Sequence, residues 1–342
     1  MNLSAPIFFA VITTLLLSVI LTKGCLLFSK KYGLFIDEPN ERSSHSGSVP
    51  RCGGISIAVI TLFAVVFFVG FKDIRITGYL IGAVLVTVLG IIDDLSQLSS
   101  KTKLAATIVI ALVPLMFGIS FLNHDILFGI PAAQYLLSFV WIFGMMNAFN
   151  FMDGIDGLIG GSSIVYSFFL MCLAYLYGNN AVLLMSSVLM ITCCGFTFFN
   201  FSPASIFLGD VGSMFLGFSF AVFSIMIVRE NNVAELFWAP AAIFAPVIYD
   251  SMFTFFNRVF RKEKFTTPHK EHLYQQLVIL GFSHRVVSSF YYMLAMLAGT
   301  SALLFMYYSD ARRWLLALLV FLVLAGFTIR VYGLQEENRK NV

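Results

Sequence analysis

Charge is scarce in this chain. Of its 342 residues only 11% are charged, whereas 59% are hydrophobic, and the mean hydropathy is +0.90. Soluble globular domains carry about 25% charged residues, so that class is excluded. Alternating ten-residue strand patterns are also missing, which argues against an outer-membrane barrel. We therefore expect an all-α, polytopic integral membrane protein that forms one transmembrane domain over residues 1–342.

Several functional signals are absent as well. The five cysteines show neither CxxC nor Cys/His ligand spacing, so no zinc site is supported. The first apolar run lacks a basic start and a small-residue cleavage site, and it reads as a retained helix rather than a signal peptide. No inverted repeat is apparent, which counts against a secondary transporter. Nothing indicates nucleic-acid binding.

Apolar runs near the roughly 20-residue length that spans a bilayer recur along the chain. They predict about eleven transmembrane helices, several of them short. The runs are 5–27, 53–71, 78–92, 104–122, 132–150, 158–177, 181–199, 211–228, 236–256, 286–308 and 312–332.

The basic residues predict the orientation, because cytoplasmic loops carry an excess of lysine and arginine. Of 21 basic residues, only five fall on the side of the N-terminus: Lys72, Arg75, Arg229, Arg312 and Arg313. We therefore expect the N-terminus outside and the C-terminus in the cytoplasm. The cytoplasmic loops are then 28–52, 93–103, 151–157, 200–210 and 257–285.

Six aspartates lie at or near the cytoplasmic ends of apolar runs: Asp93, Asp94, Asp153, Asp156, Asp210 and Asp250. A carboxylate costs roughly 2.5–3.5 kcal/mol at mid-bilayer on insertion scales, and less near the interface. An acidic cluster on one face therefore needs compensation, for which a divalent cation is suited.

The pair Asp93-Asp94 ends the third run. Two carboxylates at a helix C-terminus repel each other and oppose the helix dipole. Lys101 and Lys103 could offset them, as could a bound cation; the alternative is a solvated acidic helix end. The DDxxD spacing of prenyltransferases is absent.

The motif NAFNFMDGIDGL places Asp153 and Asp156 three residues apart, so that they share a face if the segment is helical. Asn147 and Asn150 repeat this spacing one turn earlier. The alternative is a glycine-rich loop with solvated aspartates. Four polar side chains in this register favour a functional surface.

The motif NFSPASIFLGDVGS places Asp210 just ahead of the eighth run, where exposed backbone amides could hold phosphate oxygens. Phe207 could offer a stacking face to a base. Taken alone, Asp210 is better explained as an ordinary N-cap.

Two cytoplasmic loops are rich in anion donors. The first contains His45 and Arg51, and the loop 257–285 contains His269 and His272 at i, i+3 after a proline. Without zinc-type partners, phosphate hydrogen bonding is favoured over metal binding for these histidines. The alternative for the basic charges is a topology signal alone.

Asp250 lies inside the ninth run, about one turn from its cytoplasmic end. An intramembrane carboxylate is a functional hypothesis by default. A structural partner, either Arg258 or a histidine, is equally consistent with the sequence. His284 carries no predicted role.

Taken together, the motifs resemble those of the polyprenyl-phosphate N-acetylhexosamine-1-phosphate transferases. This family includes initiators of lipid-linked glycans and the translocase of peptidoglycan synthesis. The matching stretches, in the order of the family, are PNERSSHSGSVPRCGG, GIIDDLSQ, NAFNFMDGIDGL, FNFSPASIFLGDVGS, PVIYD and PHKEHLYQQL. Any one is weak, but six in order are specific.

The resemblance implies roles for individual residues. Asp93 and Asp94 match the paired catalytic aspartates, and Asp210 matches the ligand of Mg²⁺, for which Mn²⁺ can substitute. Phe207 falls where the family stacks uracil, and His269 and His272 where it has a histidine-rich loop. The cleft-lining polar positions correspond to Asn147, Asn150, Asp153, Asp156 and Asn200.

The resemblance also implies the reaction: a sugar-1-phosphate passes from a UDP-N-acetylhexosamine to undecaprenyl phosphate at the cytoplasmic face of the bacterial inner membrane. The triple-histidine run of the peptidoglycan translocase is absent, which favours the branch that initiates O-antigen or related glycans. The sugar stays open among GlcNAc, QuiNAc and FucNAc, as does a homodimer. The rival interpretation is a transporter or flippase of an anionic lipid-linked substrate.

Overall fold

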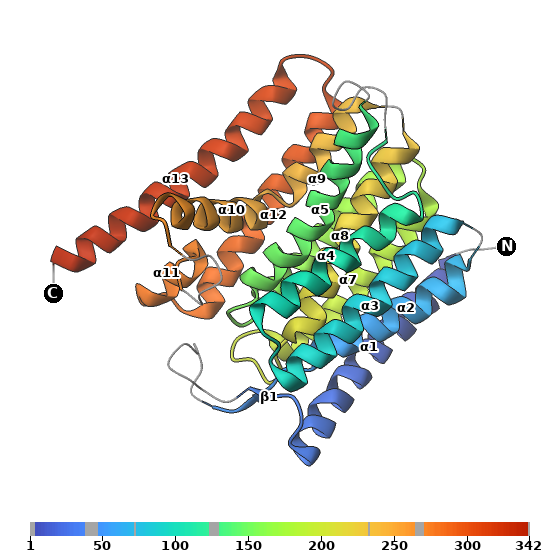
Figure 1. Cartoon of the computed structure of the whole chain (residues 1–342), viewed down its shortest axis with the longest axis horizontal. Helices are drawn as coiled ribbons and strands as arrows, with labels where there is room; N and C mark the ends of the chain where they lie inside the picture. The colour runs from blue at the N-terminus through green and yellow to red at the C-terminus, as the bar shows by residue number, and fades with distance from the viewer. Residues whose placement is uncertain are drawn as a thin grey trace.

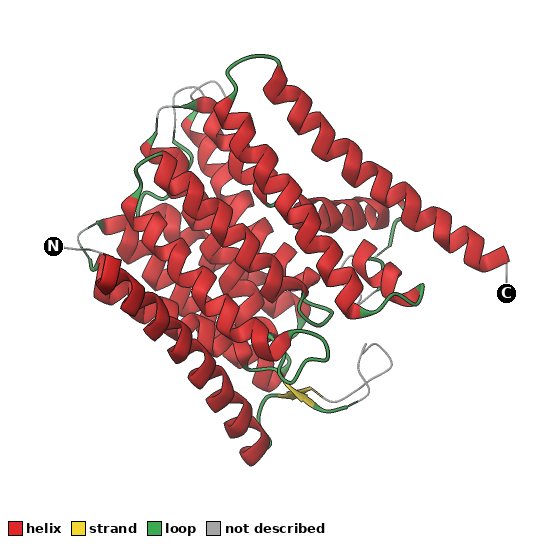
Figure 2. Cartoon of the chain, turned by 180° about the vertical axis from the view of Figure 1, so that it is seen from behind, coloured by secondary structure: helices red, strands yellow, loops and turns green. Residues whose placement is uncertain are grey.

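A computed structural model describes residues 4–37, 47–71, 73–122, 130–231, 233–263 and 270–340. The regular structure of these residues is helical apart from a two-stranded antiparallel ribbon, β1 (Ile36–Asp37) with β2 (Val49–Pro50) (Figures 1 and 2). The helices are α1 (Ser4–Tyr32), α2 (Gly53–Ala64), α3 (Ile74–Ser96), α4 (Ser100–Met116), α5 (Pro131–Met152), α6 (Leu158–Leu176), α7 (Asn180–Asn200), α8 (Gly209–Glu230), α9 (Trp238–Ile243), α10 (Ala245–Phe260), α11 (Leu273–Ile279), α12 (His284–Tyr307) and α13 (Arg312–Lys340).

The expectation of an all-α, multi-pass membrane protein is confirmed. Each of the eleven apolar runs contains a helix, and a π-helical turn (Val65–Val69) prolongs α2. Within the described ranges, eight helices are long and apolar enough to cross a bilayer, and a bent pair makes nine if it crosses as one span. The number eleven and the orientation of the termini stay predictions.

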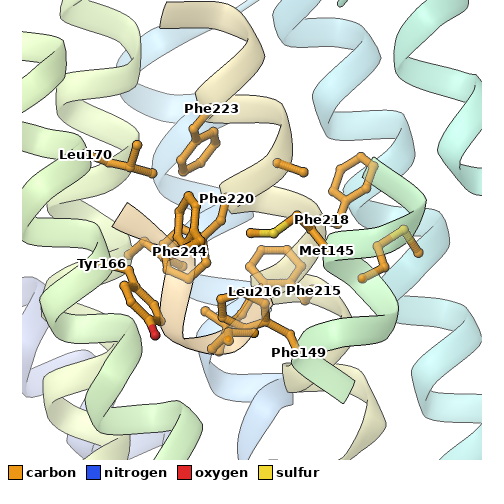
Figure 3. Packing of buried hydrophobic residues seen from close by; sticks show 14 of the residues in the cluster. Met145, Phe149, Tyr166, Leu170, Phe215, Leu216, Phe218, Phe220, Phe223 and Phe244 are labelled. Carbon is orange, nitrogen blue, oxygen red and sulfur yellow. The ribbon is translucent and has the colours of Figure 1, made fainter. Parts of the chain in front are cut away.

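The ninth run is not the continuous helix that its hydropathy predicts. A 3₁₀ turn (Ala234–Phe237) leads into α9, and α10 follows at an angle of 78°. Proline accounts for the break, because Pro246 lacks the amide hydrogen that a continuous helix needs at that position. The Phe244 ring at the bend lies 5.1 Å from Tyr166 and 5.3 Å from Phe220 (Figure 3). These aromatic contacts fix where the chain turns.

The loop predicted over 257–285 also contains a short helix that the sequence did not predict. The short helix α11 begins at Leu273 and packs against α10, α12 and α13. Seven residues are too few for a hydropathy or periodicity signal, and isolated helices of this length are unstable in water. Tertiary contacts therefore form α11.

Helix α8 lies at the centre of the bundle, and every residue from Val211 to Val228 is buried. It is apolar on all sides, as a helix surrounded by other helices must be. Helices α2, α3 and α5 pack directly against it. The position of its N-terminal end is thereby fixed with respect to all three.

Two glycines allow the close approach at that end. A Cβ on Gly90 of α3 would lie 2.4 Å from the Cα of Val211, and one on Gly54 of α2 would lie 2.2 Å from the Cα of Gly212. Both neighbours are backbone atoms, which cannot move aside as a flexible side chain can. Backbone contact between α3 and α8 therefore depends on glycine at position 90.

We predict that Gly90→Ala destabilises the protein, because the added methyl group forces α3 and α8 apart. Overpacking of this kind costs about 1–3 kcal/mol. Thermal unfolding of the detergent-solubilised protein measures the effect. Gly144→Ala on α5 is the matched control, since its Cβ would meet nothing within 4 Å. Equal unfolding temperatures for both variants would contradict this view of the α3–α8 contact.

Candidate active site

The polar segments converge at one end of the bundle. There the C-terminal ends of α3 and α5 meet the N-terminal end of α8, close to the β1–β2 ribbon (Figure 1). The ribbon continues into this contact, because the Phe207 amide donates to the Pro50 carbonyl and the Gly53 amide donates to the Phe207 carbonyl. Phe207 is half-buried here beside Arg51.

Asp94 binds the first turn of α8. Its two carboxylate oxygens accept hydrogen bonds from the backbone amides of Asp210 at 3.1 Å and of Val211 at 3.2 Å. Arg51 lies alongside, donating to the Asp94 carbonyl at 2.8 Å. The N-cap interpretation of Asp210 is therefore wrong. Leu208 occupies the N-cap position without a side-chain cap, and Asp94, 116 residues away from Asp210, supplies the missing acceptor.

Lys103 of α4 joins two carboxylates. Its ammonium lies 2.8 Å from Asp93 Oδ2 and 2.6 Å from Asp210 Oδ2. Asn150 of α5 completes the surroundings of Asp210, donating from Nδ2 to Oδ1 at 2.6 Å. Side chains from four helices thus meet around Asp210. Lys101, by contrast, is exposed on the first turn of α4.

Asp153 lies just beyond α5, and the segment 153–157 is not helical. The condition for a shared helical face of Asp153 and Asp156 is therefore not met. Gly157, with φ of 77°, adopts a conformation that favours glycine and begins a new helix direction. Burial raises the pKa of Asp153 well above its usual range, and the charges of Asp210 and Asp94 raise it further. Burial is thus the main reason that the charged form of Asp153 is disfavoured, and the neighbouring carboxylates add to it.

Asp156 points to a different set of partners. Its carboxylate accepts from the Ala204 amide at 3.2 Å and lies 3.4 Å from His284 Nδ1. Burial is the largest influence and raises the pKa of Asp156, but His284 together with the hydrogen bonds from Ala204 and Ser202 outweighs it, so the net shift is downward. Sequence reasoning missed His284. The available signal was Ser283, whose side chain caps α12 and places His284 on its first turn.

The remaining predicted residues form hydrogen bonds away from Asp210 or lie outside the described residues. Asn200 bridges two loops, accepting from the Gly157 amide and donating to the Ile206 carbonyl. Asn147 donates to the Phe143 carbonyl of its own helix. Neither is linked to Asp210 by these bonds. His45 and His269 lie outside the described residues.

His272 is buried, and its Nδ1 lies 3.1 Å from Asp250 Oδ1. Of the two structural partners considered for Asp250, the histidine is therefore the one observed. Arg258 pairs with Glu271 at 2.5 Å and with Glu263 at 3.1 Å.

The donors around Asp210 suit a hard divalent cation. Carboxylate and amide oxygens are the ligands that Mg²⁺ takes, and it is usually held by one or two carboxylates together with substrate phosphates. In the part of the chain that the structure describes, no three Asp, Glu, His or Cys side chains form a cation site on their own. Asp93 and Asp210 with Asn150 fit the two-carboxylate pattern.

Fold and site together define a class: multi-pass, all-α membrane proteins with an acidic cluster at one end of the bundle. The model of glycosyl transferase family 4 matches residues 76–228. A probable undecaprenyl-phosphate N-acetylglucosaminyl 1-phosphate transferase of Bacillus subtilis is 31% identical, over 97% of this chain and 93% of its own length.

Two further relatives are similar over shorter stretches of the chain. An undecaprenyl-phosphate alpha-N-acetylglucosaminyl 1-phosphate transferase of Thermotoga maritima is 30% identical, over 75% of this chain and 77% of its own. A phospho-N-acetylmuramoyl-pentapeptide-transferase of Staphylococcus saprophyticus is 31% identical, but over 59% of this chain and 70% of its own. The chain belongs to glycosyl transferase family 4, the polyprenyl-phosphate N-acetylhexosamine-1-phosphate transferases.

We predict that Lys103→Ala destabilises the protein measured in EDTA, because Asp93 and Asp210 lose the cation between them. Hydrogen bonds to charged groups contribute about 1.5–3 kcal/mol each. Thermal unfolding in detergent is the measurement, and added Mg²⁺ should stabilise the variant more than the wild type. Lys101→Ala, two residues away and exposed, is the control and should unfold like the wild type. If both variants behave alike, Lys103 does not bridge the carboxylates.

Proposed function

We propose that this protein transfers an N-acetylhexosamine-1-phosphate from a UDP-sugar to undecaprenyl phosphate and releases UMP. The observation that carries the proposal is the meeting of Asp93, Asp94 and Asp210 with Lys103 at one end of the bundle. Phosphoryl transfer depends on positioning and charge neutralisation more than on covalent chemistry. The relatives' names support the same reaction class.

Asp210, with help from Asp93, would hold the Mg²⁺, and Mn²⁺ would be accepted in its place. The bound cation supplies neutralisation of the diphosphate and of the departing UMP. Lys103 adds fixed positive charge beside Asp93 and Asp210, and Arg51 adds it beside Asp94. Asp94 keeps the first turn of α8, and hence Asp210, in a fixed position.

The acceptor brings its own nucleophile. A phosphate monoester has a second pKa of about 6, so the lipid phosphate is mostly dianionic at neutral pH and needs no strong base. Its oxygen attacks the phosphorus that carries the sugar, and the bond from that phosphorus to the UMP oxygen breaks. Asp93 or Asp94 would position the acceptor or take up a residual proton.

The position of the site suits substrates of opposite solubility. The prenyl chain stays in hydrocarbon while its phosphate reaches the bundle end where the nucleotide arrives from water. The distribution of basic residues supports a cytoplasmic position for that end, and we propose a bacterial inner membrane as the location. Initiation of O-antigen or a related glycan, rather than a muramoyl-pentapeptide pathway, is the branch that we propose.

We predict that Asp210→Asn lowers turnover by roughly 100-fold or more, because misplaced substrate groups lose about that factor. The assay is UMP release from a UDP-N-acetylhexosamine panel that includes the GlcNAc, QuiNAc and FucNAc donors, with undecaprenyl phosphate, in Mg²⁺ or in EDTA. The control is Asp310→Asn, an exposed residue just ahead of α13. Substantial turnover in Asp210→Asn, or wild-type turnover in EDTA, would remove the metal site from the mechanism.

Direct attack also predicts the outcome of a trapping experiment. Enzyme incubated with a donor labelled in the sugar-linked phosphate, but without undecaprenyl phosphate, should stay unlabelled. A covalent aspartyl-phosphate route would instead label the protein. Loss of such a label in Asp93→Asn or Asp94→Asn would then identify the nucleophile, and direct transfer would be wrong.

A further inference from the structure

Asp250 is a fully buried carboxylate that the proposed chemistry leaves unused. It lies on α10, on the buried face of that helix, with 1% of its surface exposed. A buried carboxylate is costly unless hydrogen bonds satisfy it. Asp250 is well supplied: His272 Nδ1, the backbone amides of Leu273 and Tyr274, and the Tyr291 hydroxyl all bond its two oxygens.

Three of these four groups belong to one short segment. Asp250 Oδ1 lies 3.1 Å from His272 Nδ1 and 3.0 Å from the Leu273 amide, and Oδ2 lies 3.3 Å from the Tyr274 amide. The carboxylate therefore binds the first turn of α11 as Asp94 binds the first turn of α8. Because a carboxylate oxygen faces Nδ1, that nitrogen must carry a hydrogen, which fixes the imidazole's orientation.

The segment held by Asp250 in turn contacts the end of α5. The Tyr274 hydroxyl donates to the Phe151 carbonyl at 3.0 Å, and the His272 ring lies 6.2 Å from the Phe151 ring. A Cβ on Gly154 would stand 2.2 Å from the Tyr274 hydroxyl oxygen, so this contact is close. Asn150, one residue before Phe151, donates to Asp210. The chain of contacts thus runs from α10 to the acidic cluster.

We infer that Asp250 is a positioning residue of the active site. It sets His272 and Tyr274 against the last turn of α5, and through that turn it fixes Asn150 and Asp153 with respect to Asp210. This inference rests on the proposed function for its kinetic consequence. The structural part of the inference, that Asp250 holds the segment 150–157 in place, does not depend on the proposed function.

The competing explanation is that Asp250 merely attaches α11 to α10. The two explanations can be separated because α10 has a second attachment to this segment. Arg258 of α10 forms an ion pair with Glu271 at 2.5 Å. Glu271→Gln weakens that attachment but leaves every hydrogen bond to Asp250 in place. Tyr291→Phe removes one donor to Asp250 from the side of α12, without touching α11. Both are matched controls.

The kinetic test compares Asp250→Asn with these controls in the UMP-release assay. The amide keeps the volume of the carboxylate but presents an NH₂ group to donors. Loss of the groups that orient metal-ligating histidines costs about 10–100-fold, and we expect a fall in kcat of the same order for Asp250→Asn. Glu271→Gln and Tyr291→Phe should stay within about threefold of the wild type. Asp250→Asn also loses hydrogen bonds to a buried group and should unfold at a lower temperature, so kcat is compared well below the unfolding temperature of every variant.

Double-mutant cycles test whether Asp250 acts on the active site through His272 and Tyr274. If Asp250 acts through His272 and Tyr274, the losses in Asp250→Asn/His272→Gln and Asp250→Asn/Tyr274→Phe are well short of the product of the single losses. Multiplicative losses would overturn the inference, as would equal losses in Asp250→Asn and Glu271→Gln.

Hydrogen–deuterium exchange tests the structural content independently of the reaction. Asp250→Asn should speed amide exchange over 150–157, whereas Glu271→Gln should leave it unchanged. If wild-type protein releases no UMP from any donor but this exchange pattern holds, the proposed function fails and the positioning role survives. Unchanged exchange over 150–157 in Asp250→Asn refutes the positioning role, whatever the turnover.

Discussion

The contact between the Asp94 carboxylate and the first amides of α8 is the constraint on which the site depends. A helix begins with backbone amides that have no partner within the helix, and a buried helix start must find acceptors elsewhere. Leu208 offers none at the N-cap of α8. Asp94 provides both oxygens, so the ends of α3 and α8 are joined, and Asp93 and Asp210 are brought within reach of one ammonium.

A carboxylate that binds the first amides of a helix from another element occurs twice in this structure. Asp94 on α3 binds the start of α8, and Asp250 on α10 binds the start of α11. In each case a carboxylate near the end of an apolar run accepts hydrogen bonds from the first backbone amides of a helix, which lowers the cost of its burial. These aspartates therefore organise the site by shaping the backbone, whereas Asp93 and Asp210 present their carboxylates to a shared cation.

The sequence could predict which residues approach one another only where topology alone decides it. Asp93, Asp94 and Asp210 sit at the ends of apolar runs on one face, so counting helices was enough to place them together. Counting helices could not predict the partners of Asp156 and Asp250. These partners, His284 and His272, follow loops whose paths depend on tertiary contacts. The bend at Phe244 was likewise hidden inside an apolar run, although Pro246 marked it.

Charge at the site explains why a diphosphate would need a cation there. Among the described residues, Lys103 pairs with Asp93 and Asp210, and Arg51 lies beside Asp94. The charges of Asp210 and Asp94 add to the burial that raises the pKa of Asp153. A nucleotide diphosphate and a lipid phosphate would add several further negative charges at short range. Two fixed cations cannot balance that sum, but a divalent ion bound together with the donor would. Under the proposed function, the acidic cluster would therefore accept its anionic substrate together with a metal ion.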